Sequence, residues 1–235
     1  MPDAAPPPVT NRLIDALPPR QRARLLRNCV PEHLHFGEVL AAPDQRIRDI
    51  HFPLVGFISL VVEVDGHPPL EAALIGNEGM LGATVLLGID QVALRAVVQG
   101  SGSALRIDAP QLRRDLRSLP ALRAALGRYL FVTLTQLAQT AACSRFHEAE
   151  PRLARWLLLV HDRAHADHFR LTHSYLAEML GVQRSAVTIA AGALQRRRLI
   201  RYSRGEIRVL DRTGLEAASC ECYRRTVDQY AQGFA

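Results

Sequence analysis

The segment of residues 171–210, LTHSYLAEMLGVQRSAVTIAAGALQRRRLIRYSRGEIRVL, constrains the fold more than any other part of the chain. Within it, Ala177 precedes Gly181 by four residues and Val187 follows Gly181 by six. In a helix-turn-helix, a small residue lets the two helices cross, Gly takes the positive φ of the turn, and an apolar residue of the second helix points inward. The spacing therefore predicts a helix-turn-helix.

The two helices of this motif can be placed from their starts and their apolar faces. Thr172 is a preferred type of N-cap, so we expect the first helix over Ser174–Leu180. The second helix is expected over about Arg184–Arg196. The inward face consists of apolar residues at helical spacing, namely Leu176, Leu180, Val182, Val187, Ala191 and Leu194.

The outer face of the second predicted helix carries side chains suited to reading DNA. Its N-terminal end would enter a major groove first. There, Arg184 can bond O6 and N7 of guanine together, and Ile189 can touch a thymine methyl group. Ser185 and Thr188 can reach a base or a phosphate. The candidate DNA-binding residues are Thr172, Gln183, Arg184, Ser185, Thr188, Ile189 and Arg204.

A basic hairpin follows the motif and is typical of a wing. We expect strands over Ile200–Tyr202 and Glu206–Leu210, joined by a turn at Ser203–Gly205. Arg204 lies at the tip and is expected to bind a phosphate, which positions the protein without specifying a sequence. The alternative is a packed helical hairpin with an exposed basic face, but the order of the cues favours a winged helix-turn-helix.

The net charge of +6 favours a polyanionic partner, although charge alone does not distinguish DNA from RNA or an anionic membrane. The chain contains no Lys, so all 29 basic residues are Arg. Arginine binds phosphate or guanine through two parallel contacts. Codon bias in a GC-rich genome is the simpler explanation for most of these positions.

Residues 30–107 have a different texture, with short apolar runs between Gly, Pro and Asp residues. This regular spacing favours an all-β barrel or sandwich with hairpin turns such as Asp65-Gly66. The expected breaks include Pro53 and Gly100–Gly102. The runs are His51–Phe52, Phe57–Val64, Leu70–Ile75, Leu81–Leu87, Ala93–Gln99 and Ala104–Ile107.

A long helix is predicted over residues 119–141, after a short one over Ala109–Ser118. Its narrow apolar stripe resembles a coiled-coil seam and needs a partner. We expect a homodimer joined through this stripe, and the alternative is burial against the chain's own β domain. The candidate dimer residues are Leu122, Leu126, Tyr129, Thr133 and Leu137.

The four cysteines do not form a recognisable site motif. Cys220 and Cys222 make a C-x-C pair, and Cys143 and His147 have helical i,i+4 spacing, so a redox or metal role is conceivable. No complete four-ligand motif is visible, however, and we expect no metal. We also find no nucleophile–base–orienter set and expect no enzyme activity.

No apolar stretch is long enough to span a bilayer, and the start of the chain lacks the basic and apolar regions of a signal peptide. We therefore expect a cytoplasmic protein with reduced thiols and no membrane partner.

Taken together, the segments resemble the Crp/Fnr family of bacterial transcription regulators along nearly the whole chain. The resemblance is carried by HFGEVL (35–40), FPLVGFISLVVEVDG (52–66), GNEGMLGATVLLG (76–88), ALRIDAPQL (104–112), RLARWLLLVHDR (152–163) and residues 171–210. It implies an α+β chain with an N-terminal antiparallel β-roll of cyclic-nucleotide-binding type, a jelly-roll, over residues 11–117. A dimerisation helix and hinge over 118–147 and a winged helix-turn-helix over 148–235 follow.

The resemblance also implies an effector pocket, from which two key groups are missing. Relatives that bind cyclic AMP have Gly-Glu and Arg-Ser or Arg-Thr where this chain has Gly82-Ala83 and Ala93-Leu94. An unpaired buried phosphate is costly, so we do not expect cyclic AMP, and we expect no cofactor. Two alternatives remain for the pocket: it holds a different effector, or it holds none. The pocket candidates are Gly82, Ala83, Thr84 and Arg95, since Arg95 would share a strand face with the missing arginine.

The recognition helix departs from the family pattern as well. Arg184 matches the arginine that reads guanine, but Ser185 and Ile189 replace Glu and Arg of the cyclic-AMP receptor protein, so the operator should differ. Gln183 replaces the usual Ser cap.

The expected function is a dimeric, sequence-specific regulator that binds a palindromic operator in double-stranded DNA and contacts RNA polymerase. The alternative is a scaffold module that acts through protein contacts and has a degenerate winged helix.

Overall fold

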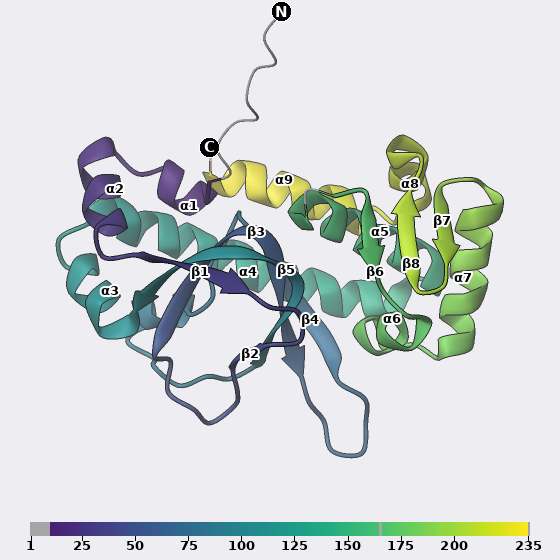
Figure 1. Ribbon diagram of the computed structural model, residues 1–235, viewed down its shortest axis with the longest axis horizontal. Helices are drawn as coiled ribbons and strands as arrows, with labels where there is room; N and C mark the ends of the chain where they lie inside the picture. Colours follow the sequence, from purple (N-terminus) through teal and green to yellow (C-terminus); the bar gives the residue numbers. More distant parts are fainter. Residues whose placement is uncertain (1–9, 165, 235) are drawn as a thin grey trace, which may run out of the picture.

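Two antiparallel sheets of unequal size organise the chain (Figure 1). The computed structural model describes residues 10–164 and 166–234. The larger sheet consists of β1 (Val30–Leu34), β2 (Val39–Ala41), β3 (Asp49–Val62), β4 (Leu70–Ile75) and β5 (Arg95–Asp108), in the order β1-β5-β3-β4 with β2 also on β5. The smaller has the order β6-β8-β7, from β6 (His168–Arg170), β7 (Ile200–Ser203) and β8 (Glu206–Val209). The expected α+β class is confirmed.

Helices surround the sheets and connect them (Figure 1). Those near the larger sheet are α1 (Arg12–Asp15), α2 (Pro19–Leu26), the 3₁₀ helix η1 (Ala83–Leu87), α3 (Ala109–Leu116) and α4 (Pro120–Phe146). Those of the C-terminal part are α5 (Ala149–Ala164), α6 (His173–Leu180), α7 (Arg184–Arg196), α8 (Arg212–Ala218) and α9 (Cys222–Phe234). The last helix, α9, runs back along α4 toward the larger sheet.

Strands β3 and β5 continue through the positions where the sequence predicted breaks. β3 passes through Pro53, and β5 passes through Gly100–Gly102, with register shifts in their pairing at these points. Gly56 has a φ of +83°, and a Cβ atom there would collide with the backbone of Gly100. The glycines therefore permit close backbone approach inside a long, irregular ladder, and the expectation of separate strands was wrong.

The run Leu81–Leu87, expected to be a strand, is mostly the 3₁₀ helix η1. Gly82 and Gly88 flank it with φ values of +91° and +78°. These two glycines adopt the left-handed backbone conformation at the two ends of η1. A residue in a paired strand does not adopt that conformation, so the run forms a tight helical turn.

The predicted dimer stripe of α4 packs inside its own chain. Leu122, Leu126 and Tyr129 are at most 2% exposed and belong to the core beneath the larger sheet. Thr133 and Leu137 are half-buried and line a cavity against the same sheet. Leu122, Leu126 and Tyr129 are therefore not available to a partner, and the assignment of the dimer surface to these three was wrong. For Thr133 and Leu137 the assignment stays a prediction.

The C-terminal part docks directly on the larger sheet. Trp156 Nε1 of α5 donates a hydrogen bond to Glu71 Oε1 of β4 at 2.6 Å. Arg163 of α5 forms a buried ion pair with Glu78, with Nη2 and Oε1 2.6 Å apart. Phe57 and Leu74 of the larger sheet share a core with apolar residues of α5, α6 and α7. In the described part of the chain, no helix is long and apolar enough to cross a membrane.

Candidate nucleic-acid interface

The helix-turn-helix forms as predicted, in α6 and α7. Thr172 Oγ1 accepts a hydrogen bond from the N–H of Tyr175 at 3.2 Å and so caps α6. Gly181 ends α6 with a φ of +61°. Helix α7 begins at Arg184 and ends at Arg196, with no side-chain bond from Gln183 at its cap. The bounds of α7 are those inferred from the spacing, and α6 begins one residue earlier than predicted, at His173.

Helix α7 turns one face inward and one face to solvent. Val187, Ala190, Ala191 and Leu194 are buried in the core shared with α5 and α6. The predicted DNA-reading residues Arg184, Ser185, Thr188 and Ile189 lie on the other face, largely open to solvent. Ile189 is 71% exposed, which is a large apolar side chain for a helix surface in water. This face meets the geometric requirement for entering a major groove.

A histidine that the sequence did not single out connects α7 to the wing. His173 Nδ1 lies 3.0 Å from Thr188 Oγ1. The His173 ring also stacks on Tyr202, with ring centroids 4.3 Å apart. Burial, together with the nearby charge of Arg184, lowers the pKa of His173. A neutral ring there links the recognition helix to β7 without adding charge.

The wing is the β7–β8 hairpin. Ser203 pairs with Glu206, and the two residues between them, Arg204 and Gly205, have φ values of +51° and +81°. These values match a primed two-residue hairpin turn, which places Arg204 at the exposed tip. Three more arginines are exposed on the same small sheet and add to its positive charge, namely Arg170, Arg201 and Arg208.

A cavity of about 1090 Å³ lies between the larger sheet, η1 and α4. Its lining includes three of the four predicted pocket residues, Gly82, Ala83 and Thr84. Tyr129, Thr133 and Leu137 of α4 also face it. A ligand in this cavity would therefore touch the long helix directly.

Arg95, the fourth predicted pocket residue, does not line the cavity. Its Nη1 lies 2.6 Å from Glu63 Oε1, and both side chains are well exposed. The guanidinium is thus neutralised on the outside of the sheet, and the assignment of Arg95 to the pocket was wrong. The cationic side chains that do line the cavity are Arg46, Arg48 and Arg113.

The solvent-facing side of α4 carries its own apolar seam. Phe131 and Leu134 are 67% and 65% exposed. Gly127, Ala138 and Ala141 are exposed as well, so the seam repeats at spacings of four and three residues. That repeat is the coiled-coil pattern. Helix α4 therefore has two apolar stripes at this spacing. The one that contains Leu122 and Leu126 packs into the core of its own chain, and the one that contains Phe131 and Leu134 faces solvent.

Three cysteines and one histidine, expected to form no complete set, come together at the end of α4. The ligand atoms of Cys143, His147, Cys220 and Cys222 all lie within 4.8 Å of one another. The sequence showed no complete four-ligand motif, but the fold places all four ligands together. C-x-C and i,i+4 spacings each supply half of the group, and only the fold brings the halves together.

Comparison with known proteins places these features in a class. Residues 151–218 match the Crp-like helix-turn-helix domain family. No curated protein matches the chain. Among solved structures, FixK2 from Bradyrhizobium japonicum is similar with a TM-score of 0.68 and 15% identity, over 82% of this chain and 98% of that one. A putative Crp/Fnr regulator from Eubacterium rectale has a TM-score of 0.67 and 16% identity, over 88% and 96%.

A third structure is described as the c-di-GMP responsive global regulator CLP from Xanthomonas campestris. It has a TM-score of 0.65 and 17% identity, over 81% of this chain and 98% of that one. Residues 151–218 thus belong to the Crp-like helix-turn-helix domain family. The chain as a whole has the fold of the solved Crp/Fnr regulators to which it is similar.

Proposed function

We propose that the protein is a homodimeric regulator that recognises a two-fold symmetric operator through α7. One observation carries this proposal: the outer face of α7 presents four side chains to solvent while its inner face packs against α5 and α6. The four side chains are Arg184, Ser185, Thr188 and Ile189. Arg184 reads a guanine, and Ile189 contacts a thymine methyl group. Thr172, Gln183 and Arg204 hold flanking phosphates.

The dimer forms through the outer seam of α4. Phe131 and Leu134 supply the large apolar contacts, and Gly127, Ala138 and Ala141 let two helices approach closely. Each Å² of apolar surface that these side chains bury in the dimer stabilises it by about 25 cal/mol. Two-fold symmetry of this pair would set the half-sites about one helical turn apart.

The effector, where one acts, is not cyclic AMP. Ala83 stands where a ribose-binding carboxylate would be needed, and Arg95 is engaged by Glu63 outside the cavity. A ligand of the cavity would contact Thr133 and Leu137 of α4. It would thereby shift the equilibrium between two positions of the DNA-binding parts of the dimer. Contact with RNA polymerase belongs to the same proposal.

Selection of bound duplexes from a random pool tests the proposal. We expect enrichment of a palindrome whose half-sites are separated by about one helical turn, and a gel shift of the dimer. A pool without enrichment would favour a scaffold module that acts through protein contacts. The random pool contains every short sequence. A lack of enrichment would therefore not result from the absence of the operator from the pool.

A further inference from the structure

The group formed by Cys143, His147, Cys220 and Cys222 lies where three helices meet. Cys143 is in the last turn of α4, and His147 is its C-cap residue. Cys220 follows α8, and Cys222 begins α9. These residues therefore come from both sides of the link between α4 and the DNA-binding part.

Two of the spacings between ligand atoms match those of a tetrahedral metal site, and all four atoms lie within 4.8 Å of one another. Cys143 Sγ and Cys220 Sγ are 3.6 Å apart, and Cys222 Sγ and His147 Nδ1 are 3.6 Å apart. Zinc bonds of about 2.3 Å to sulfur and about 2.0 Å to nitrogen require about 3.8 Å between sulfurs and about 3.5 Å between sulfur and nitrogen in a tetrahedron. A disulfide would need about 2.05 Å. The three thiols are free.

The surroundings provide what metal ligands need. His147 Nε2 is 3.2 Å from Glu221 Oε2, so the carboxylate can accept the ring N–H and leave Nδ1 free to ligate. Gln139 Nε2 donates to Cys222 Sγ at 2.9 Å. The cysteines are 1%, 7% and 0% exposed, so solvent reaches the group mainly at His147, which is half-buried.

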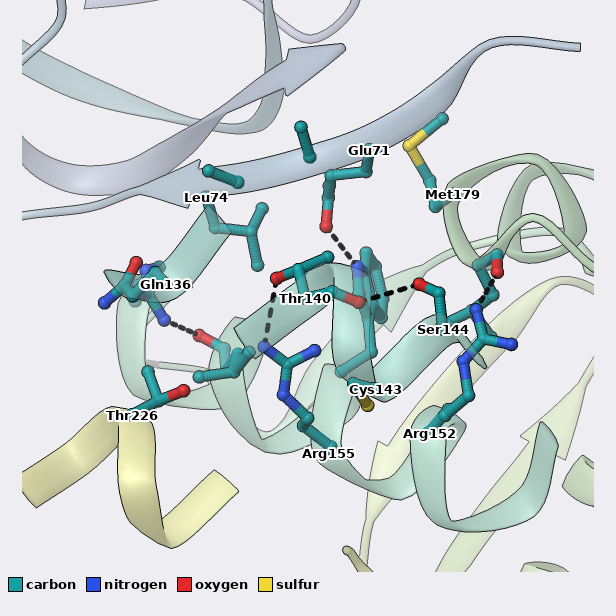
Figure 2. Close-up of a pocket in the computed structure, with 16 residues that line it drawn as sticks. Glu71, Leu74, Gln136, Thr140, Cys143, Ser144, Arg152, Arg155, Met179 and Thr226 are labelled. Carbon is teal, nitrogen blue, oxygen red and sulfur yellow. Dashed lines mark hydrogen bonds between the residues drawn. The ribbon is translucent and has the colours of Figure 1, made fainter. Parts of the chain in front are cut away.

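Positive charge nearby balances the thiolates. Figure 2 shows Cys143 between the side chains of Arg152 and Arg155, at the edge of the pocket below Glu71. A divalent ion with three thiolates has a net charge of −1, which the guanidinium groups offset. Without a metal, the same site would bury three thiols with few hydrogen-bond partners.

We propose that Cys143, His147, Cys220 and Cys222 bind one Zn²⁺ ion in a closed structural site. Three sulfur ligands and one imidazole form a known structural zinc set, and soft ligands exclude Mg²⁺ and Ca²⁺. The ion pins the end of α4 to the α8–α9 junction and so fixes the link of residues 147–148. This site is independent of the reading of DNA by α7.

Metal analysis of the full-length protein tests the site. After removal of metal under a reductant, Zn²⁺ added back should bind at one ion per chain. Co²⁺ should give the visible d–d bands and sulfur-to-cobalt charge transfer of a tetrahedral thiolate site. The variants Cys222→Ser and His147→Ala should bind at least tenfold more weakly. Cys29→Ser is the matched control, because Cys29 lies outside the group and should leave binding unchanged.

Thiol counting on the wild type covers the case in which a variant does not fold. Metal should protect the three ligand thiols from a thiol reagent, and metal removal should make three more thiols reactive. Cys29 should react slowly in both forms, because burial and the charge of Asp115 raise its pKa to about 11. The proposal is overturned if the wild type binds no stoichiometric Zn²⁺ or Co²⁺, or if Cys222→Ser binds zinc as Cys29→Ser does. A Cys143–Cys220 disulfide in place of metal, detected by mass, would also overturn it.

Discussion

The indole N–H of Trp156 donates to Glu71 Oε1 at 2.6 Å across the junction between the DNA-binding part and the larger sheet. Ser59 Oγ donates to the other carboxylate oxygen, also at 2.6 Å. Glu71 is 7% exposed as a residue, and Trp156 is the only tryptophan in the chain. The single tryptophan of the chain therefore contacts the buried carboxyl group of Glu71 directly.

This pair predicts that stability falls as pH rises. Burial raises the pKa of Glu71 from 4.5 to about 7, against hydrogen bonds from Ser59 and Trp156 that lower it. Between these values the folded protein holds a proton that the unfolded chain has lost. The contribution to the free energy of unfolding is therefore fully present below pH 4.5 and is lost as pH rises through about 7.

Denaturant unfolding at about pH 5 and about pH 8, followed by Trp156 fluorescence, checks the sign. Relative to Glu71→Gln, the wild type should lose on the order of 2–3 kcal/mol between these conditions. The neutral variant also controls for titration of the histidines. Parallel pH profiles for the two proteins would show that Glu71 is not a proton-binding group of the junction.

The wing predicts that Arg204 contributes to the salt dependence of DNA binding but not to its sequence preference. Arg204→Ala should weaken binding to all duplexes alike, because the exposed side chain at the hairpin tip meets only phosphate. The slope of log K against log salt should decrease in magnitude by about 0.9 for each phosphate that is no longer neutralised, or about twice that in a dimer. Ile189→Ala is the contrasting variant, which should change base preference and keep the slope. An unchanged slope for Arg204→Ala would argue against a phosphate contact.

The outer seam of α4 predicts which substitution separates the protomers. Leu134→Glu would bury a charge opposite its symmetry mate, which is costly, and self-association should weaken at least about a hundredfold. The protomer should keep its fold, because Leu134 is 65% exposed within one chain. Sedimentation velocity measures the change. Leu87→Glu, a substitution at another exposed apolar residue, should remain dimeric, and a dimeric Leu134→Glu would place the interface elsewhere.

The proposed zinc site predicts that chelation destabilises the wild type. A ligand at about 1,000 times its Kd adds about 4.1 kcal/mol to the free energy of unfolding. Thermal unfolding with and without a chelator should show a clear decrease in Tm for the wild type and for Cys29→Ser. Cys143→Ser should already unfold at the lower temperature and respond little. An equal response in all three proteins would point to an effect unrelated to the site.

Local signals predicted the DNA-binding part of the fold well. Thr172, Gly181 and the apolar residues of α7 act within a few turns of their own helices, so the predicted bounds of Arg184–Arg196 hold. The run Leu81–Leu87 was misread because a short apolar run has no period that separates a strand from a tight helix. Gly82 and Gly88 were the available signal, since both adopt positive φ.

Interactions between residues distant in sequence explain the remaining errors. Helix α4 has two stripes at coiled-coil spacing, and periodicity does not tell which one faces the sheet. The separation of Cys143 from Cys220 is 77 residues, so neither half of the metal group predicts the other. The Glu71–Trp156 bond joins residues 85 positions apart and leaves no local pattern either.

Binding of wild type and Arg184→Ala to the selected operator, and to the same operator with the contacted guanine pair replaced, tests the central claim most directly. We predict that base replacement costs the wild type about 1–3 kcal/mol per contact and costs Arg184→Ala almost nothing. Arg123→Ala, at an exposed position of α4, should behave like the wild type. If Arg184→Ala discriminated between the two duplexes as strongly as the wild type does, α7 would not be the reading helix.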